Sequence, residues 1–399
     1  MTKSESVASS TTNPADALPT RSRWSGLFVY GLGLFFLASL FLPALLYPDE
    51  EFDLNLFTRY MALALFAISV DLVWGYTGLL SLGQGVFFGL GAYALGYSMI
   101  LQGTEQRGLD MPDYMMQCRM EKIPEWIAIF KHTWVGITAA IIVPTTAAFI
   151  LGGIMFQRRI KGVYFSLFTQ AMLLALFVLV SNQRPYTGGV DGLTSLAKFN
   201  VLGYTFPNSY YLFFVVTGIL VVCFVGLFVL LQGKFGKILT AIRDNENRVM
   251  ALGYNTAMYK TFAYGLAGLL AGVSGALYVA ANRSAGPQFF SIPFSIEVVI
   301  LVAVGGRGTL VGPIIGTVIV KTAQNYLNDN TTMFSEFLKW IVPEFTGLFG
   351  EPVRFTEPAK LWPIWLGSLF IFSVLFMPDG IIGLLKRMAN RVAELVRVK

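Results

Sequence analysis

The chain has 399 residues, of which 55% are hydrophobic and only 13% are charged, and its mean hydropathy is +0.63. Because a soluble domain carries roughly 25% charged residues, this composition excludes an ordinary soluble protein and predicts that lipid covers much of the surface. The net charge of +6 does not indicate nucleic-acid binding, since Lys and Arg of membrane proteins collect in cytoplasmic loops.

Apolar stretches that can cross about 30 Å of hydrocarbon follow one another along the chain. They are 27–47, 60–80, 83–101, 134–156, 163–180, 210–231, 262–281, the short pair 294–304 and 309–320, and 361–376. The pattern predicts an all-α polytopic membrane protein with about ten transmembrane helices. Residues 1–26, rich in Ser and Thr, are expected to form a disordered tail.

The charges between the apolar stretches predict how the chain is oriented in the membrane. Arg21 and Arg23 precede the first stretch, and the acidic segment 48–53 follows it. The basic segments, which are 157–161, 233–260 and 386–399, are expected on the cytoplasmic side. Both termini are therefore predicted to be cytoplasmic, and residues 27–385 to form the transmembrane domain.

Two long insertions, 102–133 and 328–360, fall on the opposite, external side in this topology. Each mixes acidic, basic and aromatic residues without excess charge. We interpret them as surface loops; a docking surface for an external partner is the alternative.

The stretch "GKFGKILTAIRDNENRVMALGYN", residues 233–255, is a charged block between two apolar spans. Asn245 suits a helix N-cap, Glu246 suits the first turn, and Gly253 suits the position after a helix end. We predict two short amphipathic helices that bend at Asp244 and Asn245, with one apolar stripe formed by Ile238, Ile242, Val249 and Leu252. Such a block could dock in a groove of another protein or lie on the membrane surface.

Within this block, "AIRDNENRVMALGYN" resembles the cytoplasmic coupling loop of ABC-importer permeases, the LivM type of the hydrophobic amino-acid uptake family. Further motifs resemble the same family in the same order. They are "GYTGLLSLGQGVFFGLGAY" at 75–93, "TGGVDGLTSL" at 187–196, "VAVGGRGTLVGPIIGT" at 302–317 and "MPDGIIGLL" at 377–385.

The resemblance implies a multi-pass permease subunit in the bacterial plasma (inner) membrane. Its implied partners are a second related permease, two ATP-binding cassette subunits and an extracytoplasmic solute-binding protein. It also implies that the coupling loop contacts the ATPase, and the matching positions are Arg243, Asp244, Asn245, Glu246 and Gly253.

Within the family, "VDLVWGYTGLLSLGQG", "SIEVVILVAVGGRGTL" and the insertion with "MPDYM" resemble the urea branch. Branched-chain amino-acid members more often carry Asn, Gln and His where this chain has Asp71, Leu80 and Gln84. The expectation is therefore a permease for a small polar solute, urea. The alternatives are branched-chain or other neutral amino acids on the same machine and, more distantly, an ion-coupled secondary transporter.

Four residues are candidates for the substrate pathway: Asp71, Tyr76, Gln84 and Glu297. Acids inside predicted spans are costly and usually face a cavity or a partner, and the amide of Gln84 can bind a polar solute. Each has a structural alternative. Asp71 could make a helix-end hydrogen bond, Tyr76 could anchor at the interface, Gln84 could cap a helix, and Glu297 could pair with Arg307 or Arg283. Lys321 is expected to extend toward the membrane interface.

The glycines of the second and third spans, Gly75, Gly78, Gly83, Gly85, Gly89 and Gly91, are expected to break or thin the helices. Non-helical backbone at membrane depth is tolerated where it is buried or lines a cavity, although close helix packing explains glycine equally well. The chain has no G-x-x-x-x-G-K-[ST] motif, no metal-ligand spacing and no nucleophile–base set. We therefore expect no metal, no cofactor and no enzyme activity in this subunit.

Overall fold

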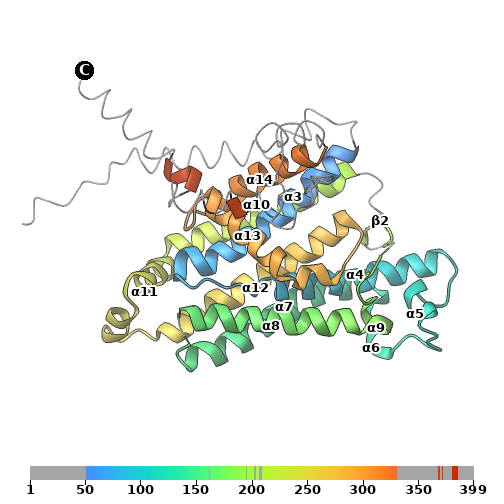
Figure 1. Cartoon of the computed structure of the whole chain (residues 1–399), viewed down its shortest axis with the longest axis horizontal. Helices are drawn as coiled ribbons and strands as arrows, with labels where there is room; N and C mark the ends of the chain where they lie inside the picture. The colour runs from blue at the N-terminus through green and yellow to red at the C-terminus, as the bar shows by residue number, and fades with distance from the viewer. Residues whose placement is uncertain are drawn as a thin grey trace, which may run out of the picture. The chain divides into compact units, whose positions relative to one another are not determined.

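The computed structural model describes residues 51–329, apart from 161, 195, 202–203 and 206–208, together with 367–368, 371 and 380–384 (Figure 1). The predicted tails 1–26 and 386–399 and the predicted span 27–47 lie outside the described residues. So do nearly all of the predicted insertion 328–360 and of the predicted span 361–376.

Each of the eight predicted spans within 51–329 corresponds to a helix. These are α3 (Glu51–Asp71, continued by the π-helix η2, Leu72–Tyr76), α4 (Gly85–Gln106), α7 (Thr133–Gln157), α8 (Val163–Asn182), α10 (Ser209–Gln232), α12 (Thr256–Asn282), α13 (Ile292–Gly305) and α14 (Val311–Asp329). Among the described residues, six helices are long and apolar enough to cross a membrane, while α13 has only 14 residues. The predicted all-α polytopic fold is confirmed.

Short elements lie between these helices. They are α5 (Asp113–Gln117), α6 (Glu125–Ala128), η3 (Ile129–Lys131), α9 (Arg184–Thr187), α11 (Lys234–Ala251), η4 (Pro287–Phe290) and a two-residue antiparallel pair, β1 (Asn200–Val201) and β2 (Tyr204–Thr205). Figure 1 shows α11 at one end of the helices and α5, α6 and α9 at the other. This arrangement agrees with the predicted opposite sides of the charged block and the first insertion.

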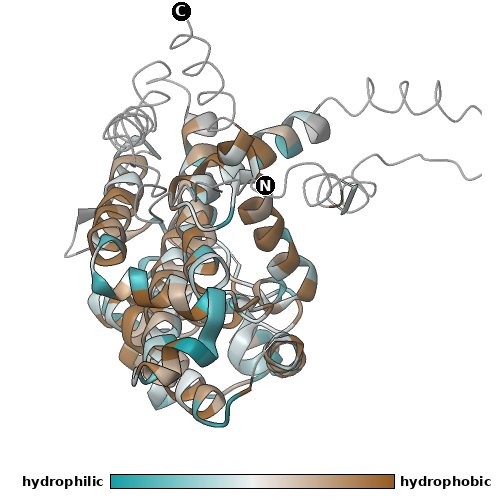
Figure 2. Cartoon of the chain, turned by 90° about the vertical axis from the view of Figure 1, so that its left-hand side faces the viewer, coloured by the Kyte–Doolittle hydropathy of each residue, from teal (hydrophilic) through white to brown (hydrophobic). Residues whose placement is uncertain are grey.

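Helix α12 lies at the centre of the described helices, where it packs against α7, α4 and α3. Its small residues allow the neighbouring backbones to approach closely. A methyl group at Gly268 would overlap Ala148, and one at Gly272 would overlap Pro144, both on α7. Helices α8 and α10 are much more exposed. Figure 2, which faces the α11 side, shows brown apolar helices with teal polar segments among them.

The chain between α3 and α4 is broken, as the glycine pattern predicts. After the π-turn η2, residues 78–84 leave the helical path, and Gly78 has a φ of +76°. The prediction is wrong for Gly89 and Gly91, which lie inside α4. A side chain at Gly89 would meet the ring of Phe290, and one at Gly91 would meet the backbone of Gly272, so both serve helix packing.

Candidate coupling site and translocation pathway

Helix α11 has the bend that the sequence predicts. Asn245 leaves the helical region with φ −159° and ψ 94°, and its Oδ1 accepts a hydrogen bond from the backbone N–H of Arg248 at 3.0 Å. Asn245 is thus the N-cap of the second segment. Gly253 follows the C-cap Leu252 and has a φ of +87°, which favours glycine. The prediction is wrong for Leu252, the last residue of the predicted apolar stripe, because it is 72% exposed.

Glu246 joins the second segment of α11 to the first turns of α12. Its Oε1 accepts hydrogen bonds from Lys260 Nζ at 2.5 Å and from Thr256 Oγ1 at 3.1 Å. Lys260 is only 4% exposed and lies 5.5 Å from the centre of the Phe156 ring. The main contact of Glu246 is therefore inside this chain, whereas Asp244 and Gly253 remain on the surface.

Arg243 ends the first segment of α11 and reaches the broken end of the second predicted span. Its Nη1 donates a hydrogen bond to the carbonyl oxygen of Gly75 at 2.6 Å, and a methyl group at Gly78 would meet its side chain. Asp71, fully buried, accepts a hydrogen bond from the backbone N–H of Gly308 at 2.6 Å. We call Asp71, Gly75, Gly78, Arg243 and Gly308 the glycine junction.

The glycine junction joins motifs that are far apart in the sequence. Residues 75–78, helix α11 and the turn 306–308 meet there, and Gly380 of the terminal motif lies against Gly306. Gly308 has a φ of +72° and Gly380 of +65°, so side chains are disfavoured at both. The motif 187–196 lies elsewhere, since Leu193 pairs with Ala285 by two backbone hydrogen bonds.

The junction has no room for a side chain at Gly75. A methyl group there would overlap Asp71 Oδ1 and the backbone of Gly308. We expect Gly75→Ala to lower transport at least about tenfold, because separating these groups breaks a buried hydrogen bond, and tenfold corresponds to ~1.4 kcal/mol. Uptake by membranes with equal amounts of permease would measure it. Gly153→Ala in α7, where a methyl group meets nothing within 4 Å, is the matched control. Equal transport by both variants would contradict the expectation.

Gln84 lies in the break between the spans and is only 1% exposed. The sequence left open that Gln84 caps a helix, but its side chain makes no capping hydrogen bond to α4. Neither its Oε1 nor its Nε2 has a hydrogen-bond partner among the described residues. The buried hydroxyl of Ser295 also lacks one there, and a methyl group at the adjacent Gly85 would meet Ser295. Since buried polar groups are nearly always paired, these atoms are available to hydrogen-bond a polar solute or water.

Glu297 has a different partner from those suggested by the sequence. Its Oε1 accepts from Lys321 Nζ at 2.5 Å, so Lys321 does not extend toward the interface as predicted. Arg307 instead lies over the Trp74 ring, 5.7 Å from its centre. Glu297 is separated from the junction by the rest of α13, a distance of ~12 Å at 1.5 Å per residue.

The four pathway candidates therefore do not form one site. Asp71 and Tyr76 lie at or beside the glycine junction, Gln84 lies in the following break, and Glu297 belongs to a separate charged cluster. Tyr76, the last residue of η2, is half-buried. Neither the Lys321–Glu297 pair nor the unpaired hydroxyl of Ser295 near Gln84 could be found from the spacing of residues along the chain.

Comparison with known families decides the class of this protein. The model of the family described as "Branched-chain amino acid transport system / permease component" matches residues 53–373, most of the chain. The chain belongs to this family. It is an ABC-type permease and a multi-pass protein of the inner membrane.

Several curated proteins are similar to this permease. The LivM permease protein of a high-affinity branched-chain amino acid transport system from Salmonella typhimurium is 23% identical over 74% of this chain and 68% of its own length. A probable LivM protein of Methanocaldococcus jannaschii is 25% identical over 79% and 89%. The ribose import permease RbsC of Bacillus subtilis is 33% identical, over 36% and 46%. No solved structure matches the chain.

These relatives are permease proteins, and none of the three is named for urea. The family expectation is confirmed at the LivM level, while the assignment to the urea branch is not supported. The departures at positions 71, 80 and 84 therefore do not indicate urea by themselves. The branched-chain alternative fits the comparisons better.

Proposed function

We propose that this permease forms part of the translocation pathway of an importer for branched-chain or other neutral amino acids. Support comes from the LivM proteins, which are similar over about three quarters of this chain. Its partners would be a second related permease, two ATP-binding cassette subunits and an extracytoplasmic solute-binding protein. ATP would be hydrolysed by the cassette subunits.

The hydrogen bond from Arg243 to Gly75 is the observation that carries the proposed coupling. The exposed face of α11 near Asp244 and Gly253 would contact the ATPase. When that contact changes with the nucleotide, α11 would shift, and Arg243 would move the carbonyl of Gly75 with it. Gly75 lies in a π-helical turn, and π-helical turns are frequent at functional sites in helices.

Movement at η2 would reach two other elements. The Asp71–Gly308 hydrogen bond connects η2 to the turn before α14, and residues 78–84 connect it to Gln84 and α4. The inner ends of three predicted spans would thus move together between two states. The unpaired amide of Gln84 and the hydroxyl of Ser295 would contact the substrate in one of them.

The decisive experiment is uptake by a host strain that lacks only this gene. We expect loss of labelled leucine uptake and unchanged urea uptake, with leucine uptake restored to the wild-type value by the full chain. Loss of urea uptake with normal amino-acid uptake would contradict the proposed substrate. In the reconstituted complex, uptake should continue after ion gradients are collapsed and stop without ATP; the opposite result would identify an ion-coupled transporter.

A further inference from the structure

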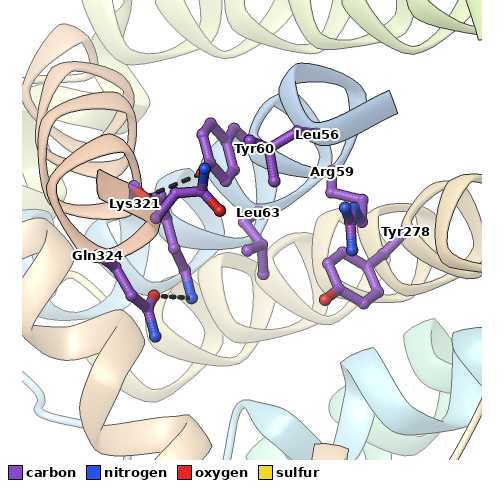
Figure 3. Close-up of a pocket in the computed structure, with 8 residues that line it drawn as sticks. Leu56, Arg59, Tyr60, Leu63, Tyr278, Lys321 and Gln324 are labelled. Atoms are coloured by element: carbon purple, nitrogen blue, oxygen red, sulfur yellow. Dashed lines mark hydrogen bonds between the residues drawn. The ribbon is translucent and has the colours of Figure 1, made fainter. Parts of the chain in front are cut away.

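A polar pocket lies between α3, α12 and α14, at the ends of these helices that are remote from the glycine junction. Leu56, Arg59, Tyr60, Leu63, Tyr278, Lys321, Gln324 and Asn325 line it. Figure 3 shows Arg59 beside Tyr278 on one side, and Lys321 with Gln324 on the other. Arg59 is 16 residues before Gly75 on α3 and η2, or ~24 Å along the helix, so the pocket lies in the predicted outer half.

The charges around this outer pocket favour an anion. Lys321 Nζ bonds to Glu297 Oε1 at 2.5 Å and to Gln324 Oε1 at 3.0 Å, so the lysine and the glutamate compensate each other. Arg59 has no carboxylate among the described residues within ion-pair distance; its Nη1 donates to the neutral Asn282 Oδ1 at 3.3 Å. One positive charge thus remains uncompensated by the described residues.

The guanidinium of Arg59 also has an unused donor. Its Nε is shielded from solvent and has no hydrogen-bond partner among the described residues. A buried charged donor without an acceptor is costly. The planar fork of a guanidinium matches the two oxygens of a carboxylate, which can accept from Nε and a terminal nitrogen together.

The size and the apolar wall of the pocket limit the rest of the ligand. Its volume is about 140 Å³, well below the roughly 300–1,000 Å³ of drug-sized sites but several times the ~30 Å³ of a water molecule. Leu56 and Leu63 of α3 supply apolar surface beside Arg59. A short aliphatic side chain could lie there while a carboxylate faces the guanidinium.

We propose that the outer pocket binds the carboxylate of a small neutral amino acid, with Arg59 as the residue that recognises it. This inference rests on the proposed function and adds a specificity-determining residue to it. Urea has no carboxylate and would leave the guanidinium without its ionic partner. The pocket would therefore bind amino acids in preference to neutral amides such as urea.

The test is equilibrium binding of labelled leucine to the purified full chain in phosphatidylcholine nanodiscs. We expect isocaproate, which keeps the carboxylate, to displace leucine, and isoamylamine and urea to have no effect. Arg59→Gln should weaken leucine binding at least about tenfold, in line with loss of a charge-assisted hydrogen bond. Arg59→Lys should weaken it less, because the charge remains. The matched control is Arg283→Gln, an exposed arginine next to Asn282, which should bind like the wild type.

Several results would overturn the proposal. These are no saturable leucine binding by the wild type, equal binding by Arg59→Gln, or displacement by isoamylamine as strong as that by isocaproate. Displacement by inorganic phosphate, or by phosphatidylglycerol added to the nanodiscs, in preference to isocaproate would show a phosphate or lipid site instead. Gel filtration establishes that each variant is folded. If leucine binds but the gene deletion leaves leucine uptake intact, the proposed function fails while the carboxylate pocket stands.

Discussion

Replacement of Glu246 by lysine is expected to reduce ATP-driven uptake at least about tenfold. The change removes the acceptor of the Lys260 and Thr256 hydrogen bonds and places a second cation beside Lys260, which is buried. Breaking a buried ion pair from one side typically costs about 3–5 kcal/mol. The second segment of α11 should therefore separate from α12. The exposed face of α11 near Asp244 and Gly253, which is proposed to contact the ATPase, should then lose its position. Uptake and ATP hydrolysis, measured on equal amounts of reconstituted complex, would show the loss.

The charge-reversed pair distinguishes this explanation from a direct effect on the ATPase. Glu246→Lys combined with Lys260→Glu restores the pair in the opposite sense and should recover a large part of the uptake. Glu105→Lys, at an exposed position near the end of α4, is the control for a simple change of charge. If the double variant is as inactive as Glu246→Lys, the ion pair with Lys260 is not the role of Glu246. Glu246 would then contact a partner subunit directly.

Asp71→Leu is expected to abolish uptake while the permease remains in the membrane. The substitution leaves the backbone N–H of Gly308 without its acceptor, and a buried unsatisfied donor costs about 1–3 kcal/mol. The turn 306–308 should then lose its connection to η2. Asp71→Asn keeps an oxygen of the same shape that can accept from Gly308, so at least half of the wild-type uptake should remain. Uptake per unit of permease in membranes measures both.

The two Asp71 variants distinguish the effect of losing the hydrogen bond to Gly308 from the effect of losing the negative charge. If Asp71→Asn is as inactive as Asp71→Leu, the negative charge itself is required, as a direct interaction with substrate would demand. If both variants transport normally, the junction does not transmit movement. Failure of Asp71→Leu alone to accumulate in the membrane would assign Asp71 a purely structural role.

Several features of the molecule followed from local properties of the sequence. Apolar length predicted the eight helices between residues 51 and 329 that correspond to spans, since a span must satisfy its backbone internally. The bend at Asn245 and the helix end before Gly253 were predictable because capping depends on residues within one turn. The family was predictable because its motifs occur in a fixed order along the chain.

The contacts between these features depended on the tertiary structure. Arg243 meets Gly75 across 168 positions, and Asp71 meets Gly308 across 237; no local rule pairs residues at such separations. Lys321 was predicted at the interface and Glu297 in the substrate pathway, with an arginine partner as the alternative, but helix packing places Lys321 and Glu297 against each other. The sequence by itself thus determined a helical membrane permease with a bent amphipathic block between two of its spans. Only the packing of the helices decided which of its charges are paired and that Arg59 faces a pocket, because side-chain pairing depends on the rotation and depth of each helix.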